Sequence, residues 1–167
     1  MFKKSGQQKF MNKFDNMIVK AIQTADSRGH NLLVNNTNID ESLANFIEFV
    51  KYCRNEEKKN ETKFRILSES IIEPLSYYFC LLNILKYDIY EINEDKKTKH
   101  IILYDNKYNT ELQIDAFQLI YDVIVNHVKF ERLEFVLNLL NGVADKKINS
   151  NNIKSEIAKI QDMTLYM

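Results

Sequence analysis

The stretch that decides the fold is residues 73–85, which read Glu73-Pro74-Leu75-Ser76-Tyr77-Tyr78-Phe79-Cys80-Leu81-Leu82-Asn83-Ile84-Leu85. This run is nearly free of charge and is apolar on every side, which is typical of a helix that other elements cover all round. Pro74 suits the first turn of such a helix, because its missing N–H would have no partner there. We therefore predict a buried central helix at about residues 74–86. A membrane-spanning helix needs roughly twenty apolar residues, so this run predicts a core element and no transmembrane segment.

The length and composition bound the class of protein. A chain of 167 residues suits a single compact domain, residues 1–167, whose core needs no disulfide or metal. Only three glycines and one proline are present, which favours long helices and argues against a phosphate-binding loop. Cys53 and Cys80 lie in apolar helical patterns, so we predict buried free thiols and an intracellular, reducing compartment.

Apolar spacing predicts two amphipathic helices at the start of the chain. The first covers about residues 7–27, has a basic polar face, and ends before Gly29, which suits a left-handed C-cap. The second covers about residues 39–54 and begins at Asn38, three residues before an acidic side chain, as in a variant capping box. The mixed charges of residues 54–61 predict a solvated helix end and linker.

A third, short helix is predicted at residues 64–72. The residue before a proline avoids helical geometry, so we expect a break or kink near Glu73, between this helix and the central one. After the central helix the apolar pattern changes to alternation. Residues 88–92 and 100–104 predict a hairpin around the charged loop 93–99, with a third strand at about 110–114.

Helical spacing returns after Asp115, a candidate N-cap. It predicts C-terminal helices within residues 115–163, at about 117–128, 133–143 and 153–160. Together these patterns predict a mainly helical α+β fold. It has six or seven helices around the buried central helix and one small antiparallel hairpin or three-stranded meander at about residues 88–114.

Local signatures of catalysis are absent from the sequence. There is no Gly-x-Ser-x-Gly elbow, no His-Glu-x-x-His and no Gly-rich phosphate loop. His30, His100 and His127 have no neighbour at metal-ligand spacing, and His127 lies near a predicted helix C-terminus that favours an imidazolium. Asp105-Asn106-Lys107 follows a predicted strand, as in metal-dependent nucleases, but the favoured interpretation is a hairpin turn. We therefore predict no enzyme activity, no cofactor and no metal.

The element order of residues 40–104 resembles that of winged helix-turn-helix domains. This resemblance implies that the central helix enters the major groove of DNA and that Lys96, Lys97 and Lys99 in the hairpin loop contact phosphate. The sequence departs from that pattern, because the central helix offers Tyr, Phe and Leu where Arg, Lys, Asn or Gln read base edges.

Basic residues also gather near the N-terminus, where Lys3, Lys4, Lys9 and Lys13 precede and enter the first helix. No continuous apolar segment follows them, so no signal peptide is predicted. With a formal net charge of zero, a basic end and an acidic middle favour a protein partner or self-association over general nucleic-acid binding and over a membrane surface. The leading expectation is therefore an accessory or regulatory protein that acts through protein contacts. Nucleic-acid binding through loop 93–99 and the N-terminal helix is the alternative.

Overall fold

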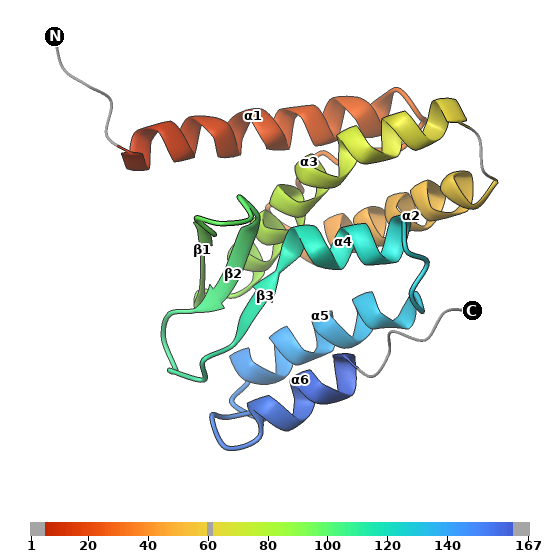
Figure 1. Ribbon diagram of the computed structural model, residues 1–167. Coiled ribbons are helices and arrows are strands. Elements are labelled where there is room, and N and C mark those ends of the chain that lie inside the picture. Colours follow the sequence, from red (N-terminus) through yellow and green to blue (C-terminus); the bar gives the residue numbers. More distant parts are fainter. Residues whose placement is uncertain (1–5, 60–61, 162–167) are drawn as a thin grey trace, which may run out of the picture.

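The computed structural model describes residues 6–59 and 62–161, and it shows the predicted mainly helical α+β fold. Within these residues there are six helices and one three-stranded antiparallel sheet (Figure 1). The helices are α1 (Gly6–Asp26), α2 (Ile39–Lys58), α3 (Thr62–Lys86), α4 (Ala116–Ile124), α5 (Glu131–Ala144) and α6 (Ile153–Gln161). The strands are β1 (Tyr90–Glu94), β2 (Ile101–Asp105) and β3 (Gln113–Asp115).

The second half of helix α3 is the buried centre of the fold, as predicted. Pro74, Tyr77, Tyr78 and Phe79 are all buried, and α1, α2, α4 and β1 all pack against this helix. The Tyr78 hydroxyl donates a 2.7 Å hydrogen bond to the carbonyl of Leu32, which fixes the segment between α1 and α2 on the core.

The predicted break before Pro74 is wrong, because α3 is helical from Thr62 to Lys86 with Pro74 inside it. An interior proline removes one backbone hydrogen bond and crowds the preceding turn. Here Ile71 and Ile72 before the proline and Leu75 after it are deeply buried, and that packing holds the helix together. Residues 40–104 therefore contain two helices before the sheet, and not the three of the winged-helix order.

Helices α1 and α2 follow the sequence signals at their ends. Gly29 has φ of +80° and follows α1, as expected for a left-handed stop. The side chain of Asn38 accepts a 3.1 Å hydrogen bond from the amide of Glu41 and caps α2. Helix α2 continues to Lys58, four residues beyond the prediction, because Arg54 and Glu57 face the protein and are not a solvated linker.

The sheet has the order β1-β2-β3, with Tyr90 opposite Asp105 and Ile102 opposite Asp115. Asp105 forms the turn between β2 and β3. Its two carboxylate oxygens accept hydrogen bonds from the amides of Lys107, Tyr108 and Thr110 and from the Thr110 hydroxyl. Burial alone would raise the pKa of Asp105, but these bonds hold it below its ordinary value. The turn interpretation of this segment is confirmed.

Helix α4 packs against α3 and the sheet, α5 packs against α4, and α6 packs against α5 (Figure 1). Asp115 caps α4 by accepting a 2.9 Å hydrogen bond from the amide of Gln118. Helix α4 ends at Ile124, earlier than predicted, and the chain turns through His127, which has φ of +52°. In α5, a Cβ at Gly142 would lie 2.6 Å from Ile148, so this glycine lets the following loop fold back on the helix.

Candidate functional site

An apolar groove of about 490 Å³ lies between α1, α3 and β1, and we call it the α1–β1 groove. Its principal lining residues are Phe10, Met11, Phe14, Leu81, Ile84 and Ile92. Three separate elements supply these side chains, so the groove exists only once the hairpin has packed beside α1.

Exposed apolar side chains extend the α1–β1 groove to the surface. Met11 is 49% exposed and lines the groove from α1. Leu85 is 45% exposed and lies one helical turn beyond Leu81 on the same face of α3. Large apolar side chains that stay half exposed beside a groove are typical of a surface that contacts another molecule.

An ion-pair cluster joins the three elements that form the α1–β1 groove. The ammonium group of Lys13 lies 3.0 Å from a carboxylate oxygen of Glu94 and 3.4 Å from one of Glu73. Partial burial by itself would lower the pKa of Lys13, but the hydrogen bond to Glu94 and the other nearby partners hold it above its ordinary value. Lys13 is therefore part of the structure that joins α1 to β1 and α3.

Of the other predicted contact lysines, those that the structure describes lie on α1 and on the β1–β2 loop. Lys3 and Lys4 lie outside the described residues, and Lys9 is exposed on α1. In the β1–β2 loop, the side chains of Lys96, Lys97 and Lys99 are exposed. Asp95 shapes this loop by accepting hydrogen bonds from the amides of Lys97 and Thr98.

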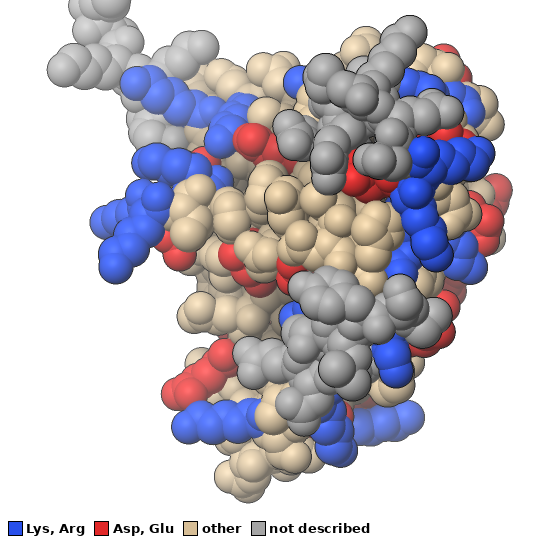
Figure 2. Space-filling view, turned by 45° about the vertical axis from the view of Figure 1, so that its right-hand side comes forward, with Lys and Arg blue, Asp and Glu red and all other residues tan. Residues whose placement is uncertain are grey.

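Figure 2 shows how charge is distributed on one face of the molecule. Lys and Arg side chains lie mainly toward its left and right edges, with uncharged residues and several Asp and Glu side chains between them. A continuous basic stripe is the usual footprint of a phosphate backbone. The described residues on this face present no such stripe.

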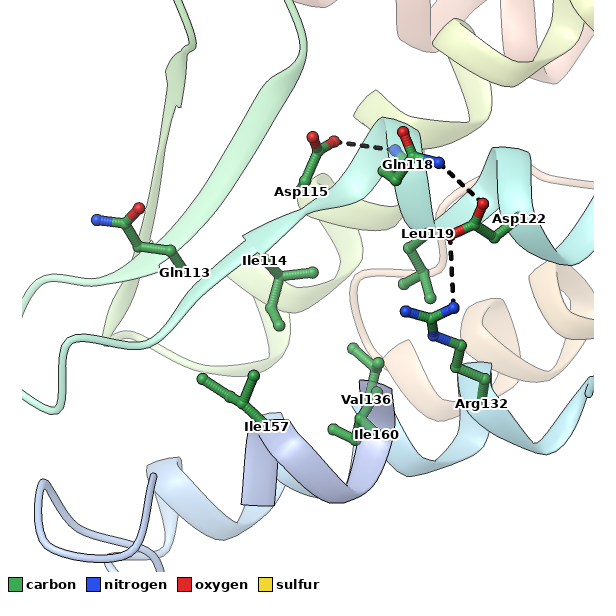
Figure 3. Close-up of a pocket in the computed structure, with 10 residues that line it drawn as sticks. All are labelled: Gln113, Ile114, Asp115, Gln118, Leu119, Asp122, Arg132, Val136, Ile157 and Ile160. Carbon is green, nitrogen blue, oxygen red and sulfur yellow. Dashed lines mark hydrogen bonds and ion pairs between the residues drawn. The ribbon is translucent and has the colours of Figure 1, made fainter. Parts of the chain in front are cut away.

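A second cavity, of about 230 Å³, lies between the β3–α4 segment and helices α5 and α6 (Figure 3). The charged groups that line it are Asp115, Asp122 and Arg132. Asp122 Oδ1 accepts 2.8 Å hydrogen bonds from the side-chain amides of Gln118 and Asn126, while Asp122 Oδ2 lies 3.4 Å from Arg132 Nη1. Sequence reasoning missed this site, because its residues come from four elements with no shared local pattern.

Two of the histidines have specific partners. His100 Nδ1 lies 2.9 Å from Asp115 Oδ2, and its ring stacks on Phe117 at 4.3 Å between centroids. The ring of His30 packs against Phe49 and Tyr52. Within residues 6–59 and 62–161, no group of three His, Cys, Asp or Glu side chains is arranged to hold a metal ion.

The expectation for His127 is wrong. Burial, together with the positive charge of Arg54, lowers the pKa of His127, so the helix end does not favour an imidazolium there. The positive charge at this end of α4 is supplied by Arg54 of α2. Its guanidinium donates a 2.7 Å hydrogen bond to the carbonyl of Val123 and further bonds to the carbonyls of His127 and Val128.

Comparison of the chain with models of protein families, with curated proteins and with solved structures found no significant match. None of the helices in the described part of the chain combines the length and apolar character needed to cross a bilayer.

Proposed function

We propose that the protein is a non-enzymatic accessory or regulatory factor that acts by binding another protein through the α1–β1 groove. The observation that carries this proposal is the combination of a 490 Å³ apolar groove with a half-exposed Met11 on its wall. Methionine side chains adapt to different apolar surfaces and are frequent where one protein receives another.

The chemistry of the groove suits a protein segment better than a small metabolite. Small-molecule sites contain a few polar groups that fix the orientation of the ligand. The α1–β1 groove has Glu91 as its one charged lining residue among those described, while its walls are aliphatic and aromatic. An amphipathic helix that inserts apolar side chains at helical spacing needs only such a surface, and we take this as the occupant.

The groove walls are also held in place before any partner arrives. Lys13 connects α1 to Glu94 at the end of β1, and Phe14 packs edge-on against Tyr77 of α3 at 5.7 Å. A preformed surface loses less conformational entropy on binding than one that must order first. This rigidity supports a binding role for the groove.

Affinity capture from the native cell with matched baits tests the proposal. Met11→Glu introduces a charge into the groove, whereas Val19→Glu makes a similar change on the same helix at a site that is 51% exposed and does not line the groove. We expect one partner protein to be retained by the parent and by Val19→Glu and lost by Met11→Glu. Equal recovery by both variants contradicts the groove as the binding site. Self-association is separated from binding of a different protein by sedimentation of the purified chain.

Binding of nucleic acid through loop 93–99 and the N-terminal helix is the second candidate. The observation in its favour is that Lys96, Lys97 and Lys99 are all exposed on one short loop. Against it, Lys13 is paired with two carboxylates, and Glu94 and Asp95 adjoin the loop lysines. These acidic groups repel a phosphate backbone, so we rank this function below protein binding.

A further inference from the structure

We propose that the cavity between the β3–α4 segment and helices α5 and α6 binds a free aliphatic α-amino acid. This site shares no lining residue with the α1–β1 groove, and its assignment does not depend on the function proposed above. Three observations carry the proposal: an incompletely paired guanidinium, an aliphatic wall and the balance of charge around the cavity.

The guanidinium belongs to Arg132, whose side chain is only 14% exposed. A guanidinium has five N–H donors in a rigid fork, and a buried charge is stable only when its donors find acceptors. Among the described residues, the Arg132 guanidinium makes one hydrogen bond, at 3.4 Å, to Asp122. Figure 3 shows the second terminal nitrogen of Arg132 turned away from Asp122 toward the cavity. This half of the fork is free to hold an acceptor.

Asp122 does not pair with both terminal nitrogens of Arg132, because its Oδ1 already accepts hydrogen bonds from other side chains. Asp122 Oδ1 accepts hydrogen bonds from both Gln118 and Asn126 at 2.8 Å. These two amides hold the carboxylate so that only Oδ2 approaches Arg132. The ligand group that best matches the remaining donors is a second carboxylate, since a carboxylate accepts two parallel N–H bonds from a guanidinium.

The apolar part of the cavity lining selects a ligand with an aliphatic body. Its apolar residues are Ile114, Leu119, Val136, Ile157 and Ile160, all branched and all aliphatic. A volume of about 230 Å³ lies below the roughly 300–1,000 Å³ of pockets for drug-sized ligands. The ligand is therefore a small molecule with a short hydrocarbon side chain.

The net charge of the lining distinguishes an amino acid from a simple fatty acid. One guanidinium and two carboxylates, from Asp115 and Asp122, line the cavity, and Asp115 Oδ2 lies 2.9 Å from His100 Nδ1. Whenever the His100 ring is uncharged, the net charge around the cavity is negative. A fatty acid would add another negative charge and be repelled. An α-amino acid brings an ammonium group with its carboxylate, and that group is attracted by the excess of carboxylate oxygens.

Calorimetric titration of the full chain with three matched probes tests the ligand class. The probes are L-leucine, 4-methylpentanoate, which lacks the ammonium group, and isoamylamine, which lacks the carboxylate. We expect L-leucine to bind saturably and each of the other two to bind about tenfold more weakly or worse, the usual effect of losing one charge-assisted hydrogen bond. Absence of saturable leucine binding up to its solubility limit overturns the proposal, as does equal binding of either truncated probe.

Two variants locate the binding site. Arg132→Gln removes the guanidinium and is expected to weaken leucine binding about tenfold. Because Arg132→Gln also breaks the pair with Asp122, thermal unfolding is measured beside it. Ile157→Phe fills the cavity without touching that pair and is expected to abolish binding, whereas Ala158→Phe, at the adjacent exposed position of α6, leaves it unchanged. Unchanged affinity in a folded Arg132→Gln or Ile157→Phe variant places leucine elsewhere and contradicts the proposal.

Discussion

The ammonium nitrogen of Lys13 lies 3.0 Å from a carboxylate oxygen of Glu94, which joins α1 to the end of β1 across 81 positions of sequence. Both side chains are partly exposed, and such pairs contribute about 0.2–1 kcal/mol. We expect a double-mutant cycle of Lys13→Met and Glu94→Gln to give a coupling energy in this range in urea unfolding, and to give less at high salt. A coupling energy of zero would mean that the pair does not position α1.

Arg54 is expected to be far more important for stability than other basic residues of α2. It satisfies carbonyls at the end of α4, and hydrogen bonds to charged donors contribute about 1.5–3 kcal/mol. Arg54→Met should therefore lower the free energy of unfolding by about 2–4 kcal/mol. Lys58→Met, an exposed control on the same helix, should change it by less than about 0.5 kcal/mol. Chemical denaturation of the two variants measures the difference, and equal effects would contradict the capping role.

The existence and the start of the helices with clear periodicity could be predicted from the sequence, while several of their ends differ by up to four residues. Asn38 and Asp115 both cap the helices that they were expected to begin, and Gly29 ends the first helix with a positive φ. These signals are local, because a cap or a left-handed stop depends on a few neighbouring residues. The apolar alternation that predicts the strands is also a local signal, and the observed strands begin within a few residues of the predicted positions.

Features that depend on tertiary packing could not be predicted. Pro74 indicates a helix start by its local chemistry, but burial on both sides keeps it inside α3. Arg54 has the sequence neighbourhood of a solvated linker, and its role depends on carbonyls that are more than 65 residues away. The two cavities are likewise assembled from elements distant in sequence, so no motif marks Arg132 or Met11 as a site residue.

Buried thiols should make the protein sensitive to alkaline pH. Burial raises the pKa of Cys53 from 9.0 to about 12. Below pH 9 the Cys53 thiol is neutral in both the folded and the unfolded protein, so its ionisation does not lower the free energy of unfolding. As the pH rises above 9, the unfolded thiol ionises and the folded one does not, so stability falls by up to about 1.4 kcal/mol per pH unit for this group.

Cys53→Ala provides the control for this pH dependence. The variant is less stable at every pH because it leaves a cavity, but it should lose less stability between pH 9 and 10 than the parent. Urea unfolding at several pH values in that interval gives both slopes. Identical slopes would show that Cys53 already ionises in the folded protein.

The loop lysines distinguish the two candidate functions. If Lys96, Lys97 and Lys99 are a solvated hairpin tip, replacing all three by Ala should change stability by no more than about 0.5 kcal/mol per site and leave partner capture intact. If they contact phosphate, each should contribute about one unit to the slope of log affinity against log salt. Gel-shift titrations of the parent and the triple variant, on mixed-sequence duplex and single strands at two salt concentrations, measure that slope. Tight binding by the parent that collapses in the variant would reverse our ranking of the two functions.

The most direct test of the central claim is photo-crosslinking in the native cell from single positions on α1. A photoreactive residue at Met11 lies on the wall of the α1–β1 groove, and the same residue at Val19 lies on the same helix outside it. We predict a covalent adduct between position 11 and a different protein, at a yield well above that from position 19. Adducts formed equally from both positions, or an adduct from position 11 with nucleic acid alone, would contradict a protein-binding groove between α1 and β1.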